Sequence, residues 1–195
     1  MTNSVRVSRA SRAASVAGAA GLISTVMTAL YFTVGQPFGT LNDIALLVMT
    51  LALAPVMLGF YELGGRTPLL PARLALASGI GAIVTWSIAQ LVFISQFTFD
   101  YQHPVTGALA VEAVMLIAIG SWLTGAPLLA GPWLTMPLRW LGAVCGVAFV
   151  LLGAGLLIGG GFHPLSLVGG LVYQLAFPVW ALLIGRLLAR RAVPA

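Results

Sequence analysis

The chain has 195 residues, of which 60% are hydrophobic and 7% charged, and its mean hydropathy is +1.06. Soluble domains carry about 25% charged residues, so this composition excludes a soluble globular domain and predicts a polytopic membrane protein. The formal net charge is +5, and all nine basic residues are arginines that cluster at the ends of apolar segments. We therefore assign the positive charge to membrane orientation and to contact with anionic lipid headgroups, and we expect the lipid bilayer and no nucleic acid as partner.

Six apolar segments are each long enough to cross a bilayer, and we predict an all-α bundle of six transmembrane helices. The expected spans are 16–34, 44–63, 74–97, 105–123, 141–158 and 165–188. The basic segment 1–15 is expected to be irregular and 189–195 to form a short tail. The first span lacks a convincing cleavage motif, so it is interpreted as an uncleaved signal-anchor.

The segment between the fourth and fifth spans is predicted to lie at the membrane surface. Residues 124–139 contain three prolines, which interrupt helical hydrogen bonding. Three tryptophans lie in or beside this segment, and indole rings favour the headgroup level of a bilayer. We therefore expect Trp122, Trp133 and Trp140 at that level.

The arginines predict the orientation of the chain. The amino-terminal segment holds three, the loop after the second span two, the loop after the fourth span one and the carboxyl end three, while the other three loops hold none. By the positive-inside rule both termini are expected to be cytoplasmic. The absence of lysine, with abundant alanine, leucine and glycine, is typical of a GC-rich bacterial genome, so the bacterial inner membrane is the expected location.

Glu112 is the carboxylate that lies clearly inside an apolar span, and an ionisable residue in that position is a functional-site hypothesis. A rise of about 1.5 Å per residue places it roughly 10 Å below the outer end of the fourth span. Gln90 lies at a similar depth in the antiparallel third span, and Trp86 one turn deeper on the same face. We predict that Glu112 points into the bundle and bonds to Gln90 or to a water. The alternative is that its carboxylate extends to the headgroups and has no role.

Gln174 lies near the middle of the sixth span, one turn before Pro178. Proline has no N–H, so the carbonyl of Gln174 loses its helical donor, and Gly170 would allow a neighbouring helix to come close. Two interpretations are open. The polar spot belongs to a ligand site, or it is a proline kink whose carbonyl is satisfied by an adjacent helix, and the second is favoured.

Acidic residues and histidines gather on the predicted outer side of the membrane. Asp43, Asp100, His103 and His163 are candidates for a metal site, since carboxylate and imidazole groups bind divalent ions. Their spacing matches no metal-binding motif, so we expect solvated loop residues and no metal or other cofactor. The single cysteine, Cys145, lies in an apolar span and is interpreted as a packing residue.

Small residues four positions apart predict close contacts between helices in lipid. The pairs are Ala75/Gly79, Ala77/Gly81, Gly142/Gly146 and Gly155/Gly159. Motifs for phosphate binding, for zinc-dependent hydrolysis and for a serine nucleophile, namely G-x-x-x-x-G-K-[ST], H-E-x-x-H and G-x-S-x-G, do not occur in the sequence.

Three short motifs resemble a family of small bacterial six-span integral membrane proteins, a domain of unknown function. They are LNDI at residues 41–44, RWLG at 139–142, and FPVW at 177–180 followed by Gly185-Arg186. The resemblance extends over most of the chain. It implies six spans and no particular activity.

We favour a non-enzymatic membrane component that binds or supports a partner, either another membrane protein or a second copy of the chain, because the small-residue faces suit helix contacts. The alternative is a small carrier, channel or sensor with an internal polar site formed by Glu112, Gln90, Trp86 and Gln174. An intramembrane enzyme ranks third, since no nucleophile is paired with a base.

Overall fold

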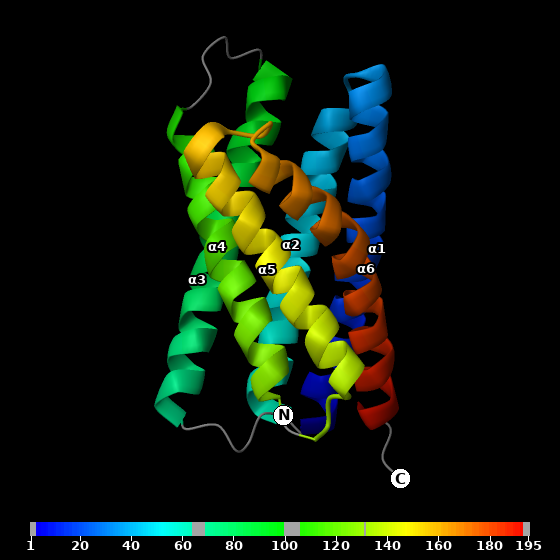
Figure 1. Ribbon diagram of the computed structural model, residues 1–195. Coiled ribbons are helices and arrows are strands. Elements are labelled where there is room, and N and C mark those ends of the chain that lie inside the picture. Colours follow the sequence, from blue (N-terminus) through cyan, green and yellow to red (C-terminus); the bar gives the residue numbers. More distant parts are fainter. Residues whose placement is uncertain (1–2, 64–68, 100–105, 131, 193–195) are drawn as a thin grey trace.

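The computed structural model describes residues 3–63, 69–99, 106–130 and 132–192, and this part of the chain contains helices and no strands. The helices are α1 (Asn3–Val34), α2 (Phe38–Leu63), α3 (Leu69–Phe99), α4 (Thr106–Leu129), α5 (Met136–Gly159) and α6 (Pro164–Ala192) (Figure 1). Each contains a stretch long and apolar enough to cross a membrane. The predicted all-α architecture with six transmembrane helices is therefore confirmed.

The helices form a closed ring in which each packs against its neighbours in sequence and α1 packs against α6. Successive helices are antiparallel, so the start of α1 and the end of α6 lie at the same end of the bundle (Figure 1). Among the described residues, the contacts of α3 with α2 and α4 are less extensive than those between the other neighbouring pairs.

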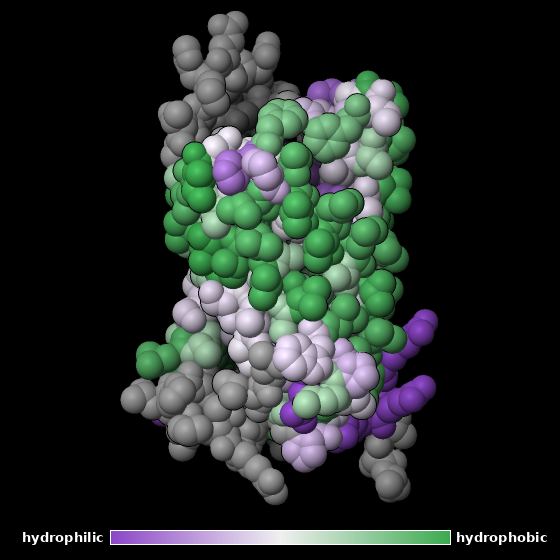
Figure 2. Space-filling view, in the orientation of Figure 1, coloured by the Kyte–Doolittle hydropathy of each residue, from purple (hydrophilic) through white to green (hydrophobic). Residues whose placement is uncertain are grey.

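Hydrophobic side chains cover the middle of the visible face, and hydrophilic residues gather towards the ends (Figure 2). Large apolar side chains stay exposed on every helix, for example Phe32 on α1, Leu91 on α3 and Leu171 on α6. The described arginines lie near the starts of α1, α3 and α5 and near the end of α6. Because the helices alternate in direction, these four helix ends share one end of the bundle, which we call the arginine end.

The amino-terminal segment is helical, so the prediction of an irregular segment at 1–15 is wrong for its described residues. Four apolar residues spaced three or four positions apart lie buried along this helix face: Val7, Ala10, Ala14 and Ala17. The Ser11 hydroxyl also donates to the Gly185 carbonyl oxygen of α6, at 2.9 Å. One face of this basic segment therefore packs on the bundle while its arginines stay exposed.

The expected interruption of helix across 124–139 is wrong in part, because α4 continues to Leu129 with Pro127 inside its last turn and α5 begins at Met136. The location of this segment at the membrane surface stays a prediction. Trp122 and Trp133 are buried inside the bundle. Both pack edge-on against the Phe60 ring, with centroid distances of 5.6 and 4.9 Å. Trp140 is exposed.

The other helices also extend beyond their predicted spans. The connection between α1 and α2 consists of Gly35, Gln36 and Pro37, so α2 begins before residue 44. The φ angle of Gly35 is +95°, in the left-handed region that favours glycine. At the carboxyl end α6 continues to Ala192, into the predicted tail.

Several of the predicted small-residue pairs lie at helix contacts. A Cβ at Gly146 would meet Thr124 and the carbonyl oxygen of Gly120, so α4 and α5 approach closely there. A Cβ at Gly142 would meet Pro127 and the Trp180 indole. The pair Ala77/Gly81 differs: both residues are exposed, and a Cβ at Gly81 would meet nothing within 4 Å among the described residues.

Candidate functional site

Glu112 and Gln90 face each other between α4 and α3, in the half of the bundle away from the arginine end. Gln90 Nε2 donates to Glu112 Oε1 across 3.1 Å. Gln90 is 1% exposed and Glu112 is half-buried. Glu112 therefore faces Gln90, as predicted. A carboxylate extended to the headgroups with Gln90 turned elsewhere is not what the structure shows.

Three buried polar atoms on α3 lie within little more than one helical turn of this hydrogen bond. They are Trp86 Nε1, which faces the Glu112 carboxyl group, and Ser87 Oγ and Gln90 Oε1, which have no hydrogen-bond partner among the described residues. Leaving a buried polar atom unpaired costs about 1–3 kcal/mol. These atoms, together with the Glu112 carboxyl group beside the Trp86 indole, form what we call the Glu112 site.

Aromatic rings connect the Glu112 site to the opposite side of the ring of helices. Trp86 packs edge-on against Phe149 of α5 at 6.0 Å, and Phe149 packs against Tyr173 of α6 at 4.7 Å. The carboxyl groups of Glu112 and Asp43 and the Tyr173 hydroxyl lie within electrostatic range of one another. Phe149 thus forms part of the apolar wall of the site.

A second polar cluster joins α1, α2 and α6. Asn42 Oδ1 accepts hydrogen bonds from Ser24 Oγ at 2.6 Å and from Thr28 Oγ1 at 3.0 Å. The amide of Gln174 donates to Thr28 Oγ1 at 3.1 Å. The sequence analysis missed this cluster, although Asn42 belongs to one of the motifs that carry the family resemblance. These three hydrogen bonds all join groups within the protein, which is typical of a cluster that holds helices together.

Gln174 therefore lies in the second cluster and not in the Glu112 site, which corrects the predicted grouping of the two residues. The carbonyl of Gln174 that Pro178 leaves free accepts a hydrogen bond from Thr25 Oγ1 at 2.9 Å. The interpretation of a kink satisfied by an adjacent helix is thus the one the structure shows. The close approach expected at Gly170 occurs at Gly169, where a Cβ would meet the α5 backbone.

The candidate metal residues do not come together in the described part of the chain, where no group of three or more histidine, cysteine or acidic side chains could hold a metal ion. Asp43 is half-buried in α2. The Leu165 amide donates to His163 Nδ1 at 3.3 Å, where α6 begins. Asp100 and His103 lie outside the described residues. Cys145 is buried in the core, as its apolar span predicts.

No protein-family model, curated protein or solved structure matches this chain. The resemblance to a six-span bacterial family, the cytoplasmic termini and the inner-membrane location stay predictions. Inference about function therefore rests on the Glu112 site itself.

Proposed function

We propose that the protein is a small non-enzymatic carrier that binds a proton or a small cation at the Glu112 site. The observation that carries the proposal is the hydrogen-bonded Glu112 carboxyl group together with two buried polar atoms, Ser87 Oγ and Gln90 Oε1, that have no hydrogen-bond partner in the described part of the chain. A carboxylate held inside a membrane bundle is costly, and in membrane proteins such groups mark ion pathways and proton relays.

The chemistry of the site suits a positive ligand. Glu112 supplies a carboxyl group, Gln90 an amide oxygen and Ser87 a hydroxyl oxygen, all of which accept hydrogen bonds or coordinate cations. The Trp86 ring offers a face that attracts cations. The carboxyl group of Asp43 lies within electrostatic range of Glu112 and, when ionised, increases the negative potential at the site.

The thin packing of α3 supports a carrier rather than a rigid scaffold. Gln90, Ser87 and Trp86 all lie on α3, the helix with the least extensive contacts. A movement of α3 would therefore open the site without separating the more closely packed helices. In contrast, Gly142 and Gly146, which favoured a partner-binding role, are occupied by contacts within the chain.

Proton flux through liposomes tests the proposal. The purified protein is reconstituted into vesicles with an internal pH-sensitive dye, and the decay of an imposed pH gradient is recorded in the presence of valinomycin and potassium. We expect faster decay with the wild-type protein than with empty vesicles, and loss of this difference with Glu112→Gln. Repeating the assay with sodium or an organic ammonium gradient covers the small-cation alternative.

Thr85→Val is the matched control, because the Thr85 hydroxyl donates to the Gly81 carbonyl of its own helix at 3.0 Å and not into the site. This variant should keep the wild-type flux. Wild-type vesicles that behave like empty ones under every gradient would refute the carrier proposal, and so would a Glu112→Gln variant that retains the full flux.

A further inference from the structure

A tyrosine hydroxyl is shared by the two polar clusters of the bundle. Tyr173 of α6 is buried, and its hydroxyl lies beside the side chains of Ser24 and Gln174, two members of the second polar cluster. Two titratable groups on other helices are in electrostatic range of the same hydroxyl, namely the carboxyl groups of Glu112 on α4 and Asp43 on α2. Tyr173 therefore connects the second polar cluster with the Glu112 site.

The second polar cluster holds this hydroxyl in place. Ser24 Oγ donates its one proton to Asn42 Oδ1 at 2.6 Å, so it meets the Tyr173 hydroxyl as an acceptor. The Gln174 amide donates to Thr28 Oγ1 at 3.1 Å, which fixes the orientation of that amide beside Tyr173. A hydroxyl group both donates and accepts hydrogen bonds, so one that is held in range of two carboxyl groups is suited to pass a proton between them.

Asp43 and Glu112 lie near the same end of the bundle, opposite the arginine end. Both α2 and α4 begin at that end (Figure 1). Asp43 follows the first residue of α2 by five positions, and Glu112 follows the first residue of α4 by six. The helical rise therefore places them about 8 and 9 Å from those helix ends. Asp43 is half-buried, so part of this residue remains accessible from outside the bundle.

The interior of the bundle towards the arginine end contains aromatic rings instead. Phe60 is buried, and its ring contacts those of Trp122, Trp133 and Trp180 at centroid distances of 5.6, 4.9 and 6.0 Å. An indole N–H group donates hydrogen bonds and accepts none, and a phenyl ring has no such group, so this layer offers no proton relay. The polar groups around Glu112 thus lead towards the end where Asp43 lies.

We propose, on the basis of the proposed transport at the Glu112 site, that its substrate is the proton and that protons reach Glu112 by way of Asp43 and Tyr173. In each transfer Asp43 loses one proton and becomes a carboxylate, and the Glu112 carboxylate gains one. The Tyr173 hydroxyl ends unchanged, because it gives one proton and takes another. Relays of acidic residues inside membrane proteins move protons in this way.

The liposome flux assay with a proton gradient tests the assignment of Asp43. Asp43→Asn keeps the shape of the side chain but removes the titratable group, so we expect the flux to fall by roughly tenfold or more. Asp43→Glu restores a carboxyl group and should retain most of the flux. The pH-dependent fluorescence of Trp86 should persist in Asp43→Asn, because Glu112 still titrates, and this readout separates a lost relay from a damaged site.

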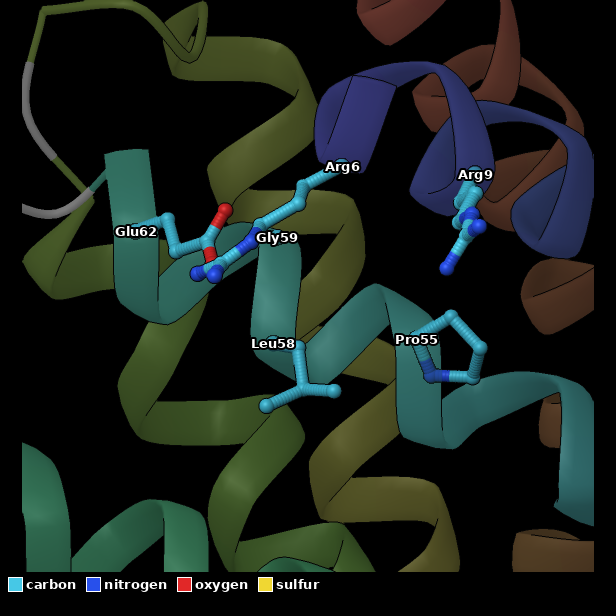
Figure 3. Close-up of a pocket in the computed structure, with 6 residues that line it drawn as sticks. All are labelled: Arg6, Arg9, Pro55, Leu58, Gly59 and Glu62. Carbon is cyan, nitrogen blue, oxygen red and sulfur yellow. The ribbon is translucent and has the colours of Figure 1, made fainter. Parts of the chain in front are cut away.

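Glu62→Gln is the matched control, because it removes one carboxyl group at the other end of the bundle. Glu62 pairs with Arg6 and lines a cavity of about 300 Å³ between the start of α1 and the last turns of α2 (Figure 3). This variant should keep the wild-type flux. A loss as large as that of Asp43→Asn would show an effect of net charge and would overturn the assignment.

Tyr173→Phe is a second test that does not depend on Asp43→Asn being folded. It removes the hydroxyl and keeps the ring that packs against Phe149 at 4.7 Å, and it should also lower the proton flux. Full flux in either Asp43→Asn or Tyr173→Phe, with loss of flux in Glu112→Gln, would overturn the relay and leave the carrier standing. Transport of sodium or ammonium ions without protons would do the same, whereas a wild-type protein without any flux would overturn both.

Discussion

The hydrogen bond from Thr25 to the Gln174 carbonyl predicts how the bundle tolerates Pro178 inside α6. The carbonyl has no helical donor, because residue 178 lacks an N–H, and Thr25 Oγ1 lies 2.9 Å from it. Thr25→Val keeps the shape of the side chain and removes this donor. Hydrogen bonds between helices in membranes contribute about 0.6 kcal/mol on average and up to about 1.7, so we expect a loss of about 1 kcal/mol.

A loss of about 1 kcal/mol lowers the Tm by roughly 2–4 °C for a chain of this length. The assay is thermal unfolding in mild detergent, followed by tryptophan fluorescence. Thr33→Val is the matched control, because this exposed α1 hydroxyl donates to the Ala29 and Leu30 carbonyls of its own helix. It should change the Tm much less than Thr25→Val does.

A double-mutant cycle isolates the role of the proline. Pro178→Ala restores an N–H for the Gln174 carbonyl, so this variant alone should keep or raise the stability. In the Pro178→Ala background, Thr25→Val should cost little, and the interaction free energy should account for most of the single effect. An equal cost of Thr25→Val in both backgrounds would refute the reasoning.

Two further predictions concern packing and topology. Gly146→Val should destabilise the bundle by roughly 1–3 kcal/mol, because its side chain meets the α4 backbone. Gly81→Val should not, because a Cβ there meets nothing within 4 Å in the described part of the chain. Equal Tm values for the two variants would contradict the packing. The topology is tested in a Cys145→Ser background. Phe162→Cys should react with a membrane-impermeant thiol reagent in intact cells and Ala189→Cys only after lysis, because both residues are exposed and lie at opposite ends of the bundle. The reverse labelling pattern would invert the predicted orientation.

The contact between Glu112 and Gln90 could be predicted because it needs only local information. In two antiparallel helices joined by one loop, residues equally far from that loop in sequence lie at the same depth. The rise per residue converts this number of residues into a depth. The same counting placed Trp86 one turn deeper, where it is buried.

The partners of Gln174 could not be predicted in this way. Thr25 and Thr28 lie on α1, at the other end of the sequence, and reach Gln174 only because α1 and α6 close the ring. The burial of Trp133 likewise depends on Phe60, which lies on a helix distant in sequence.

The helical start of α1 was predictable in principle. Apolar residues at 7, 10, 14 and 17 follow the spacing of one helix face. The three arginines of this segment, Arg6, Arg9 and Arg12, lower its mean hydropathy and hide this pattern, because mean hydropathy averages over all faces of a helix.

The fluorescence of Trp86 tests the central claim most directly, namely that Glu112 is an accessible binding group inside the bundle. The Trp86 signal is the fluorescence of the wild-type protein minus that of Trp86→Phe. It is recorded across a pH range in which both proteins stay folded. We predict that this signal changes with pH, that Glu112→Gln abolishes the change, and that Asp43→Asn, which alters the other carboxyl group in electrostatic range, retains it. A titration that persists unchanged in Glu112→Gln would contradict the claim.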